Sequence, residues 1–370
     1  LTFINISIYH MNKIIFISGG GTGGHLFPAI SIGSELIKHN FSIIYIGSKY
    51  GIEKKYFNEK NLKYYLLNIR GIQRHISFNS IFVNLLFPFR FILSYIKSII
   101  LILKYRPKAI IGTGGYASGL PLIAGICLKI PIMIQEQNSI PGLITRKLNK
   151  KTKKIFLGFK ETKKILNGTS IYTGNPVRNN LKSQNKELSK EKLGFDKNKK
   201  VILIIGGSQG ARAINYYIFN NINFFKKNNF QIYWQCGFND LSKISKIKND
   251  TIKVIPFIKD MSLAYSAADL VLSRAGAISI SELSFMKKAT IFIPLPTAAD
   301  NHQEINSKYL EKKNACISIN QKDFQTGILE KEILNILKNN NKIQELEKNI
   351  HSFSNKDATK VIVNEILKNI

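Results

Sequence analysis

Three glycine-rich segments each follow a short apolar run, at residues 19–25, 112–119 and 206–211. Glycine lets backbone N–H groups come close to an anion, and a helix that begins after such a loop adds a favourable dipole. One diphosphate needs one loop of this kind, so three loops indicate two phosphorylated substrates. The first loop lacks the Lys-Ser/Thr pair of a P-loop. No acidic residue ends the next apolar run, so the glycine spacing alone does not establish a dinucleotide site.

His25 ends the first loop and is the candidate general base. A single histidine is more often structural than catalytic. Here it follows a run of glycines at the start of a helix, where there is little core to bury it. Imidazole takes up a proton near neutral pH, so His25 is suited to accept the proton of an attacking hydroxyl.

Polar side chains follow other apolar runs as well. Residues 135–138 and 300–304 indicate ligand-facing rims, with ordinary polar loops as the alternative. Arg178 stands two residues after a proline and suits either a phosphate or base contact, or hinge packing. Residues 273–282 begin a helix whose start suits a diphosphate. Glu282 either binds ribose hydroxyls there or only compensates the helix dipole.

The alternation of apolar runs, loops and helical segments predicts a doubly wound α/β fold. A helix with proline in its first turn is expected at 28–37. The pattern restarts after a polar stretch, which predicts two Rossmann-like domains, 11–174 and 175–354, facing a central cleft, with a C-terminal helix within 355–370 packing back on the first. Strands are expected at residues 13–18, 41–46, 109–112, 130–134, 201–205, 231–235, 251–255, 270–272 and 290–293.

The chain is strongly basic, with 54 Lys and Arg against 23 Asp and Glu and a formal net charge of +31. Such a charge favours nucleic acid, an anionic membrane surface or phosphate-rich substrates. The Lys-, Ile- and Asn-rich composition of the whole chain accounts for about half of the excess. No nucleic-acid reader motif is present, so nucleic acid is not an expected partner. Three dispersed cysteines give neither a disulfide framework nor metal-ligand spacing.

One predicted helix has an apolar face and a cationic face. The apolar face has two interpretations: docking on an anionic membrane surface, or packing in the core beside a solvated charge run. No apolar stretch reaches the roughly 18 residues of a spanning helix. The apolar face comprises Phe89, Ile92, Ile96, Ile99, Ile100 and Leu103, the cationic face Arg90, Lys97 and Lys104, and a downstream basic cluster Arg146, Lys147, Lys150, Lys151, Lys153 and Lys154.

The order of these motifs resembles the family of UDP-N-acetylglucosamine transferases of bacterial peptidoglycan synthesis. The resemblance covers nearly the whole chain from Met11 and implies a GT-B fold, with two Rossmann-like domains. It implies an inverting transfer of N-acetylglucosamine from UDP to the C4 hydroxyl of lipid I, which forms lipid II. The matching segments are 20–25, 28–29, 112–116, 118–119, 136–138, 175–178, 206–211, 274–277, Asp300 and 302–303.

The resemblance also implies roles for individual residues. His25 matches the position of the proposed base, and no metal or cofactor is expected for the chemistry. The partners it implies are UDP-N-acetylglucosamine, lipid I and the anionic inner membrane, on whose cytoplasmic face a peripheral enzyme is expected. Donor contacts are expected from Thr22, Gly23, Gly24, Asn138, Arg178, Ser208, Ile258, Ala277, Ile278, Ser279, Ile280, Ser281, Glu282 and Gln303, and acceptor-diphosphate contacts from Gly21, Gly114, Gly115 and Tyr116.

Three positions depart from the family pattern. Gln135 stands where the family often has His, Ala275 where Ser is common, and Glu304 where Gln or Thr is frequent. Loss of the serine hydroxyl removes a hydrogen bond of about 1 kcal/mol. None of these departures removes the proposed base or the phosphate loops, so an active enzyme is expected, with altered donor affinity.

Other functions fit parts of the same pattern. A UDP-sugar:diacylglycerol glycosyltransferase shares the fold and differs in its acceptor. A UDP-sugar epimerase shares the architecture and acts without a lipid acceptor. A nucleic-acid-binding protein is suggested by the charge alone.

Overall fold

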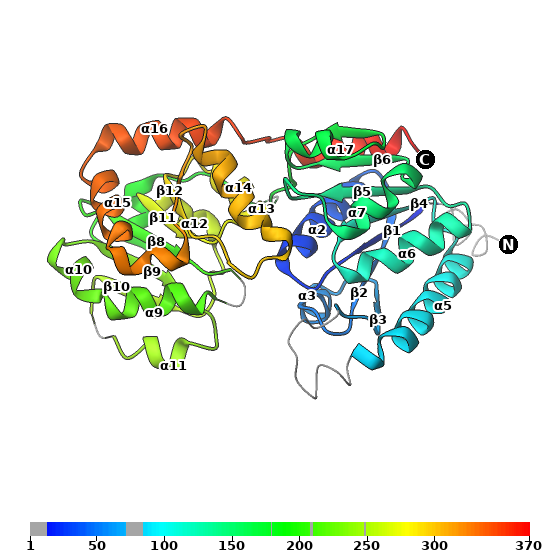
Figure 1. Ribbon diagram of the computed structural model, residues 1–370, viewed down its shortest axis with the longest axis horizontal. Helices are drawn as coiled ribbons and strands as arrows, with labels where there is room; N and C mark the ends of the chain where they lie inside the picture. Colours follow the sequence, from blue (N-terminus) through cyan, green and yellow to red (C-terminus); the bar gives the residue numbers. More distant parts are fainter. Residues whose placement is uncertain (1–12, 72–83, 179, 208–209, 248) are drawn as a thin grey trace. The chain divides into compact units, whose positions relative to one another are not determined.

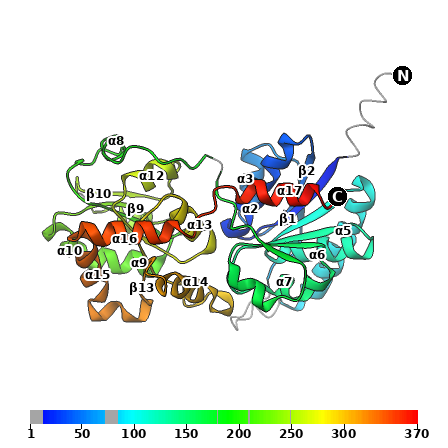
Figure 2. The ribbon, with the colours of Figure 1, turned by 90° about the horizontal axis from the view of Figure 1, so that it is seen from above.

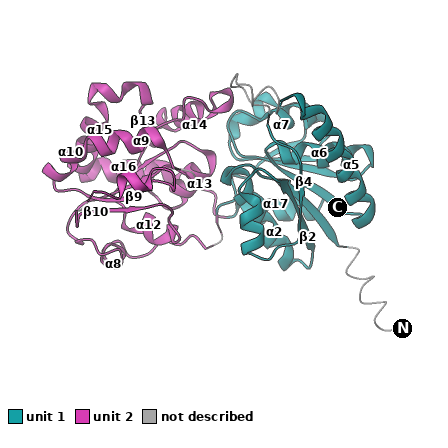
Figure 3. Ribbon diagram, turned by 90° about the horizontal axis from the view of Figure 1, so that it is seen from below, with its two compact units in different colours: residues 1–177, 357–370 teal, residues 178–356 magenta. Residues whose placement is uncertain are grey.

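The computed structural model describes residues 13–71, 84–178, 180–207, 210–247 and 249–370. The chain divides into two compact units, residues 1–177 with 357–370, and residues 178–356 (Figures 1 and 3). The division therefore follows Val177, whereas the sequence placed it at Gly174. The physical reason is Asn175, which is buried in unit 1. Its side chain accepts a hydrogen bond from Gln135 and donates one to the carbonyl of Gln137.

Unit 1 contains a seven-stranded parallel sheet in the order β3-β2-β1-β4-β5-β6-β7. The carboxyl ends of parallel strands lie at one edge of a sheet, so the loops after β1, β4 and β5 are neighbours. The strands are β1 (Ile14–Gly19), β2 (Ser42–Ser48), β3 (Tyr64–Leu67), β4 (Ala109–Gly114), β5 (Ile132–Glu136), β6 (Lys154–Leu157) and β7 (Ser170–Tyr172).

Helices cover both faces of this sheet, so its strands are apolar on both sides. Within β1, Phe16 packs with helices α5 and α6, whereas Ile17 packs with α2 and α17. Figures 1 and 2 show α17 beside α2. The helices of unit 1 are α2 (Gly23–Lys38), α3 (Glu53–Glu59), α5 (Phe87–Tyr105), α6 (Tyr116–Cys127), α7 (Leu143–Leu148) and α17 (Ala358–Leu367), with 3₁₀ turns η1 (Asn149–Lys151) and η2 (Lys160–Ile165).

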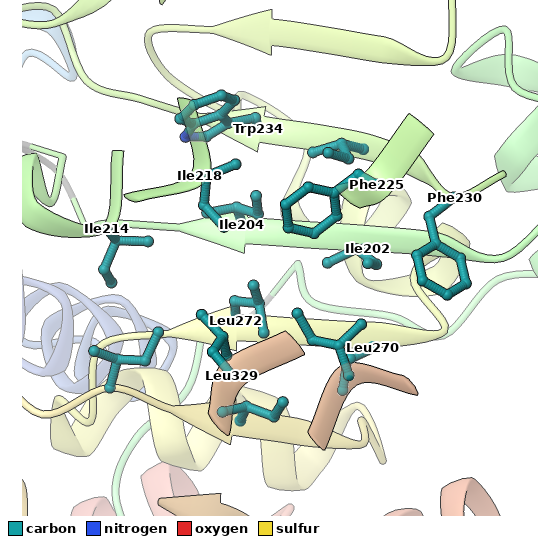
Figure 4. Close-up of a cluster of buried hydrophobic side chains, with 14 of the residues drawn as sticks. Ile202, Ile204, Ile214, Ile218, Phe225, Phe230, Trp234, Leu270, Leu272 and Leu329 are labelled. Carbon is teal, nitrogen blue, oxygen red and sulfur yellow. The ribbon is translucent and has the colours of Figure 1, made fainter. Parts of the chain in front are cut away.

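Unit 2 repeats the design with a six-stranded parallel sheet in the order β10-β9-β8-β11-β12-β13. Its core contains Trp234 (Figure 4). The indole N–H of Trp234 donates to Asn215 Oδ1 at 2.9 Å. The elements are β8 (Val201–Ile205), β9 (Gln231–Gln235), β10 (Ile252–Ile255), β11 (Leu270–Ser273), β12 (Thr290–Phe292), β13 (Ile317–Ser318), α8 (Lys186–Lys192), α9 (Arg212–Asn220), α10 (Ile222–Lys227), α11 (Leu241–Ile244), α12 (Met261–Ala267), α13 (Ala277–Phe285), α14 (His302–Glu311), α15 (Ile328–Leu337), α16 (Asn340–His351), η3 (Ala299–Asn301) and η4 (Gln321–Thr326).

The first long helix differs from its prediction. Helix α2 begins at Gly23, so Pro28 lies inside it rather than in its first turn. The carbonyl of Thr22 accepts the N–H groups of both His25 and Leu26, which starts the helix at the glycines. The prediction was wrong because it treated these glycines as loop. As a result, His25 belongs to the first turn of a 16-residue helix.

Helix α5 exposes most of its predicted apolar face. Its buried side is made by Ser94, Ser98, Leu101 and Ile102, and Ile99 is half-buried against the core. The core-packed interpretation of this face is therefore wrong, except at Ile99. The exposed apolar residues of the helix, with their exposed fractions, are Phe89 (68%), Phe91 (38%), Ile92 (55%), Leu93 (63%), Ile96 (46%), Ile100 (58%) and Leu103 (58%).

Two of the expected surface cations are tied to the fold instead. Lys97 Nζ donates to the carbonyl of Leu66 at 3.0 Å, and Lys154 in β6 pairs with Glu365 of α17 at 3.6 Å. Among the described residues, no helix is both long and apolar enough to cross a bilayer.

A buried carboxylate joins the first strand of unit 2 to its neighbouring helix. Asp269 lies 3.2 Å from Lys186 Nζ and 2.8 Å from Lys190 Nζ, and it accepts the Val201 N–H at 2.9 Å. Burial alone would raise the pKa of Asp269, but the two lysines and this N–H outweigh it, so the pKa is lowered. The ionised form is thus stabilised by folding.

We expect Asp269→Asn to lower the free energy of unfolding of unit 2 by about 3 kcal/mol at pH 7, because Lys190 remains buried without its counter-charge. A lowered pKa contributes stability above the unfolded value of about 3.9 and loses it as pH falls through the folded value. The difference between wild type and variant should therefore shrink on acidification towards that range. Urea unfolding followed by the fluorescence of Trp234, the single tryptophan, measures it.

Glu191→Gln is the matched control, because Glu191 pairs with Lys197 at the surface, with side chains 47% and 51% exposed. Exposed pairs contribute about 0–1 kcal/mol. Equal losses in the two variants would contradict a stabilising role of the buried cluster.

Candidate functional site

The first glycine loop of unit 1 lies between β1 and α2 and is held by a carboxylate that the sequence analysis missed. Glu53 is fully buried. Its Oε2 accepts the Gly21 N–H at 2.9 Å, and its Oε1 accepts the Ser48 N–H at 2.6 Å. A Cβ on Gly20 would lie 2.3 Å from Glu53 Oε1, and one on Gly51 would lie 1.9 Å from Oε2. The glycines near Glu53 in the sequence are the signal from which its role could have been predicted.

The hydrogen bond between Gly21 and Glu53 competes with the phosphate contact predicted at Gly21. In the described conformation the Gly21 N–H is paired with Glu53, so phosphate binding through that N–H requires the pair to break. Thr22 and Gly21 are exposed, and Gly23 and Gly24 are half-buried in the first turn of α2.

The second glycine loop packs against His25. The ring Nδ1 lies 3.0 Å from the carbonyl oxygen of Thr113 and 3.0 Å from Gln137 Oε1. Thr113 Oγ1 in turn donates to the carbonyl of His25 at 2.9 Å. Gly114 has φ +99°, and a Cβ there would lie 2.5 Å from His25 Nδ1. The glycine at this position is thus required by the imidazole.

Among the contacts described, the two neighbours of Nδ1 are oxygens that only accept hydrogen bonds, which places the proton on Nδ1. Neutral imidazole has one N–H, and the lone pair then belongs to Nε2. Nε2 is therefore the atom of His25 that is suited to act as a base.

The other residues of this edge divide into core and surface. Gly115 has φ +77° and caps α6, and a Cβ there would lie 2.3 Å from the carbonyl oxygen of Gly20, so the two loops touch. Tyr116 opens α6 and is 49% exposed. Asn138, after β5, is half-buried.

The polar run after β5 is mostly internal rather than a rim open to ligand. Gln135, Glu136 and Gln137 are all buried. Glu136 Oε2 accepts the Gly142 N–H at 2.9 Å and the Thr145 hydroxyl at 2.6 Å, which fixes the connection to α7. Glu136 is buried, and a buried carboxylate needs hydrogen-bond partners inside the fold. Of the four residues predicted to face a ligand, only Asn138 is therefore partly accessible.

Unit 2 holds a second cluster around Glu282, which is buried in α13. Glu282 Oε1 accepts from Arg178 Nε at 2.7 Å, and Oε2 accepts from the Tyr265 hydroxyl at 3.0 Å. Burial, and next the charge of Glu282, raise the pKa of Tyr265 well above its ordinary value, so the phenol keeps its proton as a donor. The sequence predicted Glu282 and Arg178 separately and missed Tyr265.

Four predicted donor contacts place their side chains in the core. Their exposed fractions are 3% for Ile258, 6% for Ala277, 7% for Ile278 and 2% for Ile280. Any contact they make with a ligand is therefore expected mainly through the backbone. Ser279 and Ser281 are half-buried, and Ser281 Oγ donates to the Ala277 carbonyl at 2.9 Å.

The loop after β12 is held by Arg274. Its guanidinium donates to the carbonyls of Ile293 at 3.1 Å and Pro294 at 3.0 Å, and to Gln321 Oε1 at 3.0 Å. Burial lowers the pKa of Arg274 to about 10. Gln303 Oε1 accepts the Leu295 N–H at 3.0 Å, which joins α14 to this loop.

The third glycine loop follows β8. Gln235 Nε2 donates to the carbonyl of Gly207 at 2.6 Å, and a Cβ on Gly210 would lie 2.2 Å from the Cys236 carbonyl oxygen. Ser208, the predicted donor contact, lies outside the described residues. Within the described part of the chain, no three His, Cys, Asp or Glu side chains are grouped so that they could hold a metal ion. The prediction of metal-independent chemistry stays a prediction.

Two family domains match the chain. Residues 15–157 match the Glycosyltransferase family 28 N-terminal domain, and residues 201–362 match the Glycosyltransferase family 28 C-terminal domain. The chain is 39% identical over 364 residues to the UDP-N-acetylglucosamine–N-acetylmuramyl-(pentapeptide) pyrophosphoryl-undecaprenol N-acetylglucosamine transferase of Flavobacterium psychrophilum, covering 95% of this chain and 96% of that protein. A protein of the same name from Acetivibrio thermocellus is 34% identical over 366 residues, covering 96% and 98%.

Solved structures share the architecture. Acinetobacter baumannii MurG matches with a TM-score of 0.75 and 26% identity, covering 96% of this chain and 99% of that one. The UDP-GlcNAc 2-epimerase of Neisseria meningitidis matches with a TM-score of 0.63 and 16% identity, covering 96% and 100%, and so shows the fold alone. The predicted fold class, GT-B with two Rossmann-like domains, is confirmed.

We expect Gly114→Ala to destabilise unit 1 by about 2–5 kcal/mol, because a left-handed backbone costs about 1–2 kcal/mol and an overpacked contact about 1–3 kcal/mol. Gly21→Ala is the control, since Gly21 has φ +87° but nothing within 4 Å of its added Cβ. It should lose only the backbone share, about 1–2 kcal/mol. Urea unfolding with hydrogen exchange at unit 1 peptides compares them, and equal losses would refute the close contact with His25.

Proposed function

The chain belongs to the family of UDP-N-acetylglucosamine–N-acetylmuramyl-(pentapeptide) pyrophosphoryl-undecaprenol N-acetylglucosamine transferases, and from this premise we propose that it forms lipid II. In this reaction N-acetylglucosamine moves from UDP-N-acetylglucosamine to the C4 hydroxyl of lipid I with inversion. The observation that carries the proposal, beyond family membership, is the geometry of His25. Its Nδ1 faces two acceptor oxygens, which leaves the lone pair on Nε2.

The chemistry is a single displacement. The C4 hydroxyl gives its proton to Nε2 of His25, and its oxygen forms a bond to C1 of the donor sugar. The bond from C1 to the diphosphate oxygen breaks, and UDP leaves with the electron pair. Positioning of the reactants and stabilisation of the leaving charge are the contributions required of the protein.

The donor is proposed to bind unit 2. We propose that Glu282, whose two oxygens accept from Arg178 and Tyr265, also accepts hydrogen bonds from ribose hydroxyls. The start of α13 and the loop that carries Gln303 supply N–H groups for the diphosphate. We propose that these groups stabilise departing UDP without a metal ion. Ala275, which is fully buried, and Glu304, which pairs with Lys308 at 2.6 Å, are the departures expected to alter donor affinity.

The acceptor diphosphate is proposed to bind the loops of unit 1 near Gly114, Gly115 and Tyr116. Gly115 caps α6, a helix of 12 residues. The first N–H groups of this helix and its dipole favour a bound anion. For Gly21 the proposal requires release from Glu53.

UDP release from UDP-N-acetylglucosamine tests the proposed reaction. We expect release to depend on a lipid I analogue and to persist in excess EDTA. Release with diacylglycerol instead would favour the related lipid glycosyltransferase, and turnover of the donor without any lipid would favour an epimerase. Loss of activity in EDTA with recovery on adding Mg²⁺ would contradict metal-independent catalysis.

We expect His25→Ala to lower kcat by about 100-fold or more, because removal of a general base costs about 10²–10⁴-fold. The KM for UDP-N-acetylglucosamine should change little, since most of the proposed donor contacts lie in unit 2 and His25 itself is not one of them. His351→Ala is the control, as His351 bonds to the Ser284 carbonyl in unit 2. Near-normal turnover in His25→Ala would contradict the assignment of the base.

Helix α5 is proposed to dock on the anionic cytoplasmic face of the inner membrane, where the acceptor's isoprenoid tail is held. Its exposed apolar residues support this, because an apolar patch left in contact with water is unfavourable and commonly marks a binding surface. The exposed cations Arg146, Lys147, Lys150, Lys151 and Lys153 add attraction to anionic lipid. Nucleic acid is not a proposed partner.

We expect Leu103→Glu to weaken sedimentation with anionic vesicles by about tenfold, because burial of one leucine side chain contributes about 1.5–3 kcal/mol. Leu188→Glu is the matched control, as Leu103 is 58% exposed on α5 and Leu188 is 56% exposed on α8 of unit 2. Equal effects of the two changes, or no vesicle binding by the wild type, would contradict docking through α5.

A further inference from the structure

The side-chain amide of Gln137 faces His25 in one orientation only. Gln137 is 3% exposed and follows β5. Its Nε2 donates to the carbonyl oxygens of Thr113 at 2.7 Å and of Gln135 at 3.1 Å. Carbonyl oxygens only accept hydrogen bonds, so the amide nitrogen must face them. The amide oxygen therefore faces Nδ1 of His25, at 3.0 Å.

Two further buried amides hold Gln137 in place. Gln135 Oε1 also accepts from the Gln137 amide, and Gln135 Nε2 donates to Asn175 Oδ1 at 2.9 Å. Asn175 Nδ2 donates to the backbone carbonyl of Gln137 at 3.0 Å, so the three amides form a closed hydrogen-bond network. Gly158 leaves the space for it, because a Cβ there would lie 2.2 Å from Asn175 Oδ1. Rotation of the Gln137 amide would place oxygen against oxygen, so the network opposes it.

We propose that Gln137 is a positioning residue that keeps the proton of His25 on Nδ1 and the lone pair on Nε2. The inference rests on the proposed function, in which His25 is the base. Gln137 itself touches neither substrate. It acts through His25, together with the carbonyl of Thr113, and it fixes both the tautomer and the direction of the ring.

The amide also matches the charge that develops during the reaction. When Nε2 takes the acceptor's proton, the ring becomes a cation, and a hydrogen bond from a cation is roughly twice as strong as a neutral one. Gln137 thus stabilises the product of proton transfer more than the resting base. The nearby carboxylates Glu53 and Glu136 bond to Gly21 and Ser48, and to Gly142 and Thr145, so they are engaged away from this contact.

The first test needs neither a variant of Gln137 nor substrate. Long-range ¹H–¹⁵N correlation on the full chain labelled at histidine reads the tautomer, with the His25 signals assigned by their loss in His25→Ala. We expect neutral His25 to carry its proton on Nδ1. A proton on Nε2 would overturn the inference. This result is independent of UDP release, so failure of the proposed function and failure of the inference are distinguishable.

The second test removes the amide at nearly constant volume. We expect Gln137→Met to lower kcat about tenfold, as loss of a hydrogen bond to a charged group does, and to leave the KM for UDP-N-acetylglucosamine within about twofold. The His25 spectrum should gain the form with the proton on Nε2. An unchanged kcat or an unchanged tautomer would overturn the role of Gln137.

Gln231→Met is the matched control. Gln231 is also 3% exposed, and its amide bonds only to the backbone of Asp196 among the contacts described, at 2.8 Å for both atoms. We expect a comparable loss of stability with unchanged kcat. A fall in kcat equal to that of Gln137→Met would reduce Gln137 to a structural role.

Discussion

An imidazole N–H shared between two oxygens is the contact on which the site in unit 1 depends. Nδ1 of His25 lies 3.0 Å from the Thr113 carbonyl and 3.0 Å from Gln137 Oε1. These groups come from the ends of β4 and β5 and from the start of the helix that follows β1. The three strands are adjacent in the sheet, in the order β1-β4-β5. Parallel pairing places their carboxyl ends at one edge, so sheet topology alone brings the three groups together. Glycine at 114 then leaves space for the ring.

Each unit has a partly or fully buried polar side chain whose hydrogen bonds are made inside the unit, but the central group donates in unit 1 and accepts in unit 2. In unit 1 the ring of His25, the proposed base, is met by two neutral acceptors. In unit 2 a carboxylate, Glu282, is met by two donors, a guanidinium and a phenol. A buried polar group costs free energy unless its hydrogen bonds are made, and each cluster satisfies that requirement inside its own unit.

The sequence predicted the fold class and most central strands because those strands are largely apolar runs that end at glycines or polar loop residues. β8 was predicted with its observed bounds, Val201–Ile205. The strands β3, β6, β7 and β13 were not predicted, although β3 and β6 contain short apolar runs, Tyr64–Leu67 and residues 155–157. β7 and β13 span three and two residues and contain no such run. They are strands because neighbours pair with them. Local pattern does not contain that information.

The candidate site was predicted unevenly for a similar reason. His25 stands beside glycines at a helix start, and Glu282 lies in the helix that begins after Gly276, which are local signals. The structure places both in hydrogen-bonded clusters. Their partners Gln137, Tyr265 and Glu53 act through contacts between distant segments, such as the 17-residue separation of Tyr265 and Glu282 and the 32-residue separation of Gly21 and Glu53. Whether the apolar face of α5 is core or surface likewise depended on packing against α6. Small serines, rather than the large residues, form part of the buried side.

The return of helix α17 to unit 1 bears on the order in which the chain acquires structure during synthesis. Ile362, Val363 and Ile366 complete the cluster that packs α2 against the sheet. These residues are translated after all of residues 178–356, so unit 2 is fully synthesised while one face of unit 1 still lacks its cover. Domains generally fold as units during translation, with the N-terminal one first. Here the unit that begins first is the one that is completed last, and its α2 face stays partly uncovered on the ribosome.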